Sequence, residues 1–267
     1  MSLPVSLPAD GADSADSADI VRSADVDALR LAYDRLQQQY HSLAAFLGTA
    51  SHELRSPINQ VISLHQLILE DLCESPDEER EFIAQANQTI TRVLQNLDTL
   101  INLSKLDIGA LEPAASPISL GKVLTTVRQF TEMQCTNRHC RLTLNPGADP
   151  PQVLTDDRWL TQALVSLVEA ALGANSTAIS LILMDSSVST VILGFTCNAP
   201  ASQWPPSVDA DLPLDPSHSR HGVISPSFRY QLAHRLLVHL RGTVHSRSGL
   251  SHDQHTLLIT LPSDDQG

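Results

Sequence analysis

A long heptad pattern of apolar residues constrains the first third of this chain more than any other feature. The pattern alternates steps of four and three residues over more than five heptads, at Leu29, Tyr33, Leu36, Tyr40, Leu43, Leu47, Ala50, Leu54, Pro57, Val61, Leu64 and Ile68. Such a seam is typical of a helix that packs along its length in a bundle or coiled coil. We therefore predict one long helix from near Val26, with a bend after His52 because Pro57 removes a backbone donor.

The same seam predicts the direction in which one histidine points. With Ala50 at position d and Leu54 at position a, His52 falls at position f, opposite the seam. The alternative for a helical histidine is a surface or core residue without a chemical role. Here the heptad phase favours an exposed imidazole beside the carboxylate of Glu53, where the ring can accept and pass on a phosphoryl group.

A second amphipathic helix follows a strong start signal. In Ser75-Pro76-Asp77-Glu78 the serine suits an N-cap, the proline suits the first helical position, and the glutamate closes a capping box. We predict a helix over Pro76–Asp107, whose apolar stripe comprises Ile83, Ala86, Ile90, Val93, Leu94, Leu97, Leu100, Ile101, Ser104 and Ile108. One hairpin of two such helices cannot cover stripes this wide, so we expect a homodimer that forms a four-helix bundle.

A second domain is predicted beyond the hairpin, after a hinge at Glu112–Pro117. Periodicity predicts helices at Leu120–Glu132, Asp156–Leu172 and Ser227–Leu240, and strands at Arg141–Asn145, Ala178–Met184, Val188–Thr196, Thr243–Ser246 and His255–Leu261. A loop is expected over 199–226. Helices in one layer and a mostly antiparallel sheet in another make an α+β sandwich.

The domain organisation expected is therefore a disordered tail at 1–25, a helical hairpin at 26–112, a sandwich at 118–262 and a short tail at 263–267. The first tail is predicted to be disordered up to residue 24 because its Ala-Asp-Ser repeats offer little to bury. The hairpin and the sandwich together give an α+β chain of two domains.

Composition excludes some classes of partner. The 267 residues include 17 basic and 30 acidic side chains, and a net charge of −13 argues against nucleic acid or an anionic membrane. No stretch approaches the roughly 18 apolar residues of a membrane span, and the N-terminus lacks a signal core, so we expect a cytoplasmic protein. Cys73, Cys135, Cys140 and Cys197 form no CxxC pair, so we expect reduced thiols and no metal site.

The run from Phe46 to Ile58, Phe-Leu-Gly-Thr-Ala-Ser-His-Glu-Leu-Arg-Ser-Pro-Ile, closely resembles the H-box of sensor histidine kinases. In that family the dimerisation and phosphotransfer domain is a helical hairpin, and an ATP-binding catalytic domain follows it, which this chain resembles as far as Pro262. The resemblance implies that His52 carries the phosphoryl group. Glu53 would hold the other ring nitrogen, Arg55 would help to neutralise phosphate oxygens, and Ser56 stands where the family has a residue that orients water for dephosphorylation.

The chain departs from the family where the family binds ATP. Ser166 and Ala170 stand at positions of asparagines that hold magnesium and phosphates, and Cys197 replaces the aspartate that reads adenine. Ala199 replaces a glycine of the same motif, and Ser225, followed by a proline, stands in the glycine-rich turn that approaches the phosphates. These five degenerate positions lead us to expect no cofactor unless the chain uses Mg-ATP in an unconventional way.

Three interpretations follow from the sequence. The favoured one is a phosphotransferase, in which His52 relays phosphoryl groups to and from the receiver domain of a response regulator or a partner kinase. The second is an ATP-dependent histidine autokinase with an unconventional nucleotide site. The third is a dimeric scaffold that docks receivers without phosphoryl chemistry. None of the three involves nucleic acid or a membrane.

Overall fold

The computed structural model of the chain describes residues 13–200, 203–204, 225–248 and 254–264. Residues 1–46 and 47–267 form two compact units, and helix α1 (Asp13–Leu69) begins in the first and ends in the second. The sequence predicted disorder up to residue 24, whereas α1 begins at Asp13. The alanines of the Ala-Asp-Ser repeats have the highest helix propensity, which favours this extension. Residues 1–12, 265–267 and most of the predicted loop at 199–226 lie outside the described residues.

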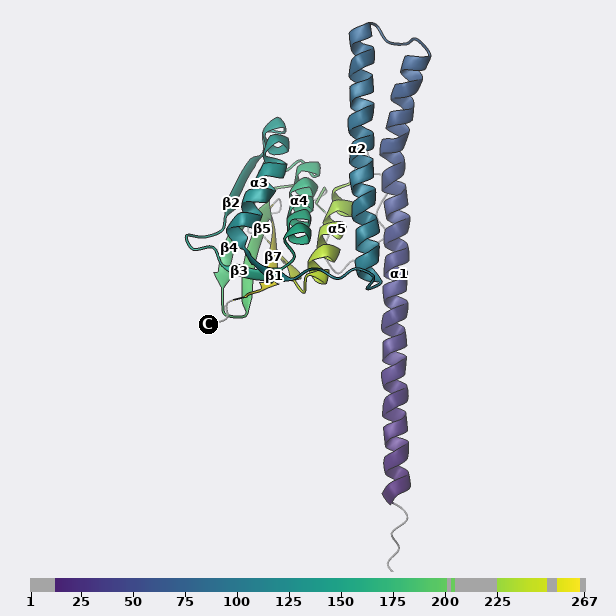
Figure 1. Cartoon of the computed structure of the whole chain (residues 1–267), viewed down its shortest axis with the longest axis vertical. Coiled ribbons are helices and arrows are strands. Elements are labelled where there is room, and N and C mark those ends of the chain that lie inside the picture. The colour runs from purple at the N-terminus through teal and green to yellow at the C-terminus, as the bar shows by residue number, and fades with distance from the viewer. Residues whose placement is uncertain (1–12, 201–202, 205–224, 249–253, 265–267) are drawn as a thin grey trace, which may run out of the picture. The chain divides into compact units, whose positions relative to one another are not determined.

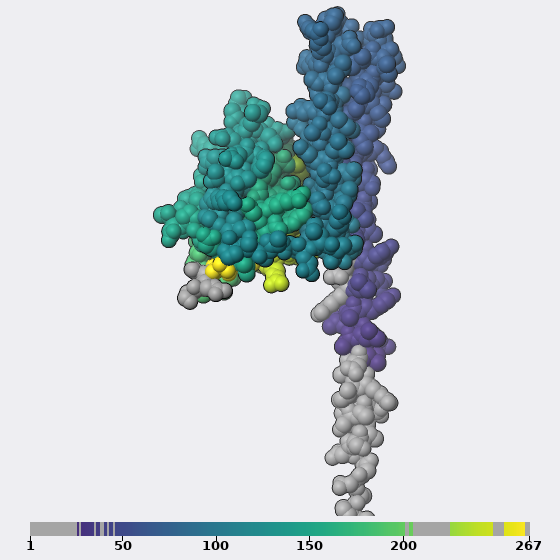
Figure 2. Space-filling model, viewed as in Figure 1, coloured from purple at the N-terminus to yellow at the C-terminus, as the bar shows by residue number. Residues whose placement is uncertain are grey.

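A helical hairpin forms as predicted. Helix α2 (Pro76–Asp107) has Ser75 as its N-cap, whose side chain accepts from the amide of Glu78 over 3.2 Å. Figure 1 shows α2 antiparallel to the second half of α1. Along α2 the residues Ala86, Val93, Leu100, Leu103 and Leu106 are buried. In the space-filling view the hairpin stands uncovered toward the turn that joins its helices (Figure 2).

The second domain is the predicted α+β sandwich. Its sheet has the order β2-β4-β5-β7-β6, in which β2 and β4 are parallel and the other neighbours are antiparallel. The strands are β2 (Arg141–Asn145), β4 (Ala178–Ser186), β5 (Thr190–Cys197), β6 (Thr243–Ser248) and β7 (His255–Pro262). Helices α3 (Leu120–Asn137), α4 (Asp157–Gly173) and α5 (Pro226–His239) cover one face of this sheet (Figure 1).

The core of the sandwich lies between the helices and the sheet. Side chains that alternate along the strands meet apolar side chains of the helices there, as the period of two residues in a strand requires. The largest fully buried residues of this layer include Leu160, Leu164, Leu167, Ile179, Leu181, Leu193, Phe195 and Leu236. Among the described helices, none combines the length and the apolar character that crossing a membrane requires.

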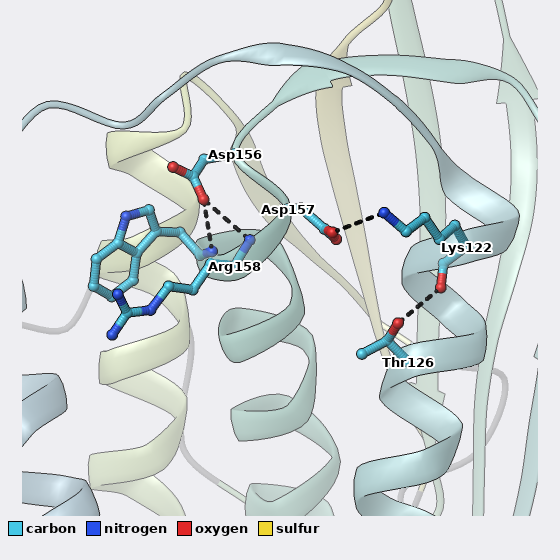
Figure 3. A network of polar contacts seen from close by, with 6 residues as sticks. Lys122, Thr126, Asp156, Asp157 and Arg158 are labelled. Carbon is cyan, nitrogen blue, oxygen red and sulfur yellow. Dashed lines mark hydrogen bonds and ion pairs between the residues drawn. The ribbon is translucent and has the colours of Figure 1, made fainter.

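The segment predicted as a hinge is attached to the sandwich. Strand β1 (Ser116–Ser119) pairs antiparallel with β3 (Gln152–Thr155), and the sequence prediction missed both short strands. The carboxylate of Asp156 accepts from the amide of Ala114 over 2.8 Å and also caps α4, accepting from the amides of Arg158 and Trp159. Figure 3 shows this cap beside the ion pair of Lys122 and Asp157. The path between the domains is therefore held at its sandwich end.

Candidate functional site

His52 lies exposed on α1, as the heptad phase predicted. The nearby seam residues point the opposite way, since Ala50 is 3% exposed and Pro57 is also buried. Within the described residues no hydrogen bond or ion pair engages the imidazole. The ring thus lies on the exposed face of the helix. The helix continues through Pro57.

Glu53 has a different partner from the one that the sequence predicted. Its side chain is 4% exposed, and its Oε2 atom accepts a hydrogen bond from the backbone amide of Ser225 over 2.7 Å. Adjacent residues of an α-helix do not face each other, so the carboxylate of Glu53 turns inward while the ring of His52 faces out. The expected role of Glu53 as the partner of the second imidazole nitrogen is corrected accordingly.

Arg55 and Ser56 lie three and four residues after His52, on the neighbouring surface of the helix. Arg55 is exposed and Ser56 is half-buried. Their expected roles, charge neutralisation and orientation of water, stay predictions.

The N-terminus of α5 uses its polar groups within the protein. The side chain of Ser225 accepts from the amide of Phe228 over 3.2 Å, and its carbonyl accepts from the amide of Arg229 at the same distance. Pro226, at the first helical position, has no amide hydrogen. The amide of Ser225 itself donates to Glu53. Most of the backbone donors that could otherwise receive an anion at this helix end are thus already occupied or missing.

A second carboxylate of the hairpin contacts the other end of α5. Asp107, the last residue of α2, lies 3.2 Å from a guanidinium nitrogen of Arg235 and 2.6 Å from Nε2 of His239. The three side chains are between 15% and 25% exposed. Sequence reasoning missed this cluster, although Arg235 and His239 are four residues apart on a predicted helix and therefore share one face.

The positions that the resemblance assigns to ATP binding are buried. Ser166 and Cys197 are each 1% exposed, and Ala170 and Ala199 are fully buried. Burial raises the pKa of the Cys197 thiol to about 12. The side chain is therefore neutral and apolar at the position where the family resemblance expects the aspartate that reads adenine. The neighbouring acidic residue, Glu169, forms an ion pair with Arg229.

An aromatic cluster lies next to Cys197 and Ala199, since His255 pairs with Cys197 across β5 and β7 and its Nε2 lies 3.1 Å from the carbonyl oxygen of Ala199. The indole of Trp204 stacks on the rings of Phe195 and His255, with centroids 6.0 and 5.6 Å apart, and meets Tyr230 edge to face. Trp204 is 7% exposed. The sequence prediction placed Trp204 in a loop and did not assign it a role.

Comparison with known proteins identifies the hairpin. Residues 42–109 match the family model of the His Kinase A (phospho-acceptor) domain. The chain is 27% identical over 161 residues to Histidine kinase 1 of Arabidopsis thaliana, covering 60% of this chain and 13% of that protein. It is 30% identical over 145 residues to the signal transduction histidine-protein kinase BarA of Escherichia coli, covering 54% of this chain and 16% of that protein. The chain thus spans a small part of these relatives.

Solved structures show the same fold over both domains. The Acinetobacter baumannii histidine kinase AdeS superposes with a TM-score of 0.60 at 18% identity, over 80% of this chain and 98% of that one. The histidine kinase ThkA, solved in complex with the response regulator protein TrrA, superposes with a TM-score of 0.58 at 14% identity, over 88% of this chain and 66% of that one. At such identities the likeness shows the fold alone.

Proposed function

Because the chain belongs to the histidine kinase family of two-component signalling proteins, we propose that it carries a phosphoryl group on His52 and exchanges it with the aspartate of a response-regulator receiver domain. The observation that carries this proposal is the exposed position of His52 on α1, within the segment that matches the phospho-acceptor model. ThkA was solved with a response regulator bound, and we propose a partner of that kind for this chain.

The proposed step requires little besides positioning. A neutral imidazole nitrogen of His52 attacks the phosphorus of the receiver's aspartyl phosphate; the N–P bond forms as the P–O bond breaks, and the aspartate carboxylate leaves. The reverse step returns the phosphoryl group to a receiver. Arg55 is exposed beside His52 and would neutralise phosphate oxygens, while Ser56 would orient a water molecule for dephosphorylation.

The source of the phosphoryl group is proposed to be a phosphorylated receiver or a partner kinase. Three observations favour this over transfer from Mg-ATP. The amide of Ser225 is bonded to Glu53, the acidic Glu169 is paired with Arg229, and the thiol of Cys197 is buried and neutral. Each of these groups is at or next to a position where the family would contact the nucleotide.

Homodimerisation is part of the proposal, because the single chain leaves much of its heptad pattern uncovered. On α2 the side chains of Ile83, Leu94, Leu97 and Ile101 are between 40% and 56% exposed. On the first part of α1, Leu29, Tyr33, Leu36 and Tyr40 are between 64% and 71% exposed. A second copy that packs against these stripes would complete a four-helix bundle and a coiled coil.

The proposal is tested by following labelled phosphoryl groups. The purified chain is incubated with Mg-ATP alone and, separately, with a panel of receiver domains that have been phosphorylated with acetyl phosphate. We expect acid-labile, base-stable label from at least one phosphorylated receiver and none from Mg-ATP. The label should be lost in His52→Ala and kept in His65→Ala, a matched control because His65 is an exposed histidine of the same helix.

Other outcomes select the other interpretations. Label from Mg-ATP that depends on His52 would identify an autokinase. Absence of label on either route, for a chain that still binds a receiver, would leave a docking scaffold and would refute the proposed transfer. A calorimetric titration with Mg-ATP gives an independent measure of nucleotide binding.

A further inference from the structure

Helix α5 is contacted at both ends by carboxylates of the hairpin. Glu53 of α1 accepts from the amide of Ser225 at the N-terminal end of α5. Asp107 of α2 contacts Arg235 and His239 near the C-terminal end. Glu53 and Asp107 both lie on helices of the hairpin, while all of their partners lie on α5 of the sandwich domain or at its N-cap.

The contact of Glu53 is favourable for electrostatic reasons. The N-terminus of a helix carries a partial positive charge and points its free amides outward, so a carboxylate is stabilised there. Glu53 is 4% exposed, and a buried charge is costly unless a hydrogen bond or a charge of opposite sign compensates it. Moving α5 away from α1 would therefore deprive both the carboxylate and the Ser225 amide of a buried partner.

The contact of Asp107 adds a second point of attachment. Arg235 and His239 lie one turn apart on α5 and contact the two different oxygens of the same carboxylate. Helix α5 is itself packed into the sandwich through buried residues such as Phe228 and Leu236. Two contacts at opposite ends of this helix therefore restrain the sandwich domain against rotation as well as translation relative to the hairpin.

We propose that Glu53 and Asp107 are positioning residues, which together clamp α5 to the hairpin and so hold the sandwich domain as a fixed wall of the surface on which a receiver docks at His52. The clamp consists of Glu53, Ser225, Asp107, Arg235 and His239. Its role in receiver docking rests on the proposed function, whereas the contacts themselves do not. In this arrangement Glu53 acts through α5 and makes no contact with the imidazole of His52.

Hydrogen exchange tests the clamp without reference to phosphoryl transfer. In Glu53→Ala the amides of the segment Ser225–Phe228 should exchange about tenfold faster or more, because a hydrogen bond to a charged acceptor is lost. Glu53→Gln keeps an oxygen acceptor and should restore part of the protection. Glu78→Ala is the matched control, since Glu78 also accepts a backbone amide next to a helix start, that of Glu74, but within the hairpin. It should leave the exchange of Ser225–Phe228 unchanged.

Transfer kinetics test the positioning role. With the receiver domain that labels the chain fastest, Glu53→Ala and Asp107→Asn should raise the KM for the phosphorylated receiver several-fold and leave the maximal single-turnover rate near that of the unaltered chain. The KM of Glu53→Gln should lie between those of the unaltered chain and Glu53→Ala. A fall in the maximal rate at unchanged KM would instead mean that Glu53 acts on the imidazole, and it would overturn the proposal.

The two experiments separate the clamp from the proposed function. Unchanged exchange at Ser225–Phe228 in Glu53→Ala refutes the clamp, whether or not His52 is labelled. Faster exchange together with no label from any receiver upholds the clamp and refutes the phosphotransfer function. Should Glu53→Ala fail to fold, Glu53→Gln gives the same two measurements with a smaller change in shape, and Asp107→Asn gives the kinetic measurement.

Discussion

The Ser225 amide and the Glu53 carboxylate form a 2.7 Å hydrogen bond between residues 172 positions apart in the chain. This bond joins the helix that carries His52 to the helix end where the family resemblance expects a glycine-rich turn. Ser225, which stands in place of the glycine-rich turn, thus binds the carboxylate that the resemblance would place on the imidazole of His52. A helix end that already binds an internal anion has less capacity for an external one.

The N-cap of α5 should contribute measurably to stability. Ser225→Ala removes the oxygen that accepts from the Phe228 amide but keeps the backbone amide that donates to Glu53. We expect a loss of about 1 kcal/mol in the free energy of unfolding, the usual cost of an N-cap serine. Urea denaturation measures it, with Ser227→Ala as the control on the same helix. Equal stabilities of the two variants would argue against the capping role.

Restoring an aspartate at position 197 should destabilise the protein. The side chain of Cys197 is 1% exposed, and burial raises the pKa of its thiol to about 12. A carboxylate there would be desolvated without a partner, so we expect Cys197→Asp to lower the unfolding free energy by about 3 kcal/mol or more. Cys197→Ala serves as the control for lost volume. A stable Cys197→Asp variant that binds Mg-ATP would contradict our view of this position.

The sequence predicted the parts of the fold that have strong periodicity. The heptad phase gave the exposed side of His52, and the start signal at Ser75 gave the first residue of α2. It missed β1 and β3 because four-residue strands are too short to show a period of two. The partners of Glu53 and Asp107 were also missed, since local patterns carry no information on which distant elements meet.

Stability should decline at high pH because of buried thiols. Burial raises the pKa of Cys197 to about 12 and that of Cys135 to about 11, from an ordinary value of 9.0. Each folded-state pKa lies above its unfolded value. The contribution of the buried thiols to the free energy of unfolding is therefore fully present below about pH 9 and is lost as the pH rises toward 11 or 12. The slope approaches about 1.4 kcal/mol per pH unit for each thiol that only the unfolded chain ionises.

Urea denaturation at neutral pH and at pH ~10 measures this decline in the free energy of unfolding. Other groups also titrate in that range, so the informative quantity is the difference between the unaltered chain and Cys197→Ala. The variant should lose less stability over the same interval. An identical pH dependence in both proteins would show that the thiol of Cys197 does not contribute.

The exposed stripe of α2 should control the oligomeric state. Leu94 and Ile101 are 56% and 45% exposed in the single chain and lie seven residues apart, on one face of the helix. A charge at either position would be buried without a partner in a four-helix bundle, so Leu94→Asp and Ile101→Asp should lower the mass in solution from two chains to one. Light scattering after gel filtration measures that mass. Gln95→Asp, at a neighbouring exposed polar position, is the matched control and should stay dimeric. A single-chain mass for the unaltered protein at micromolar concentration would refute the dimer.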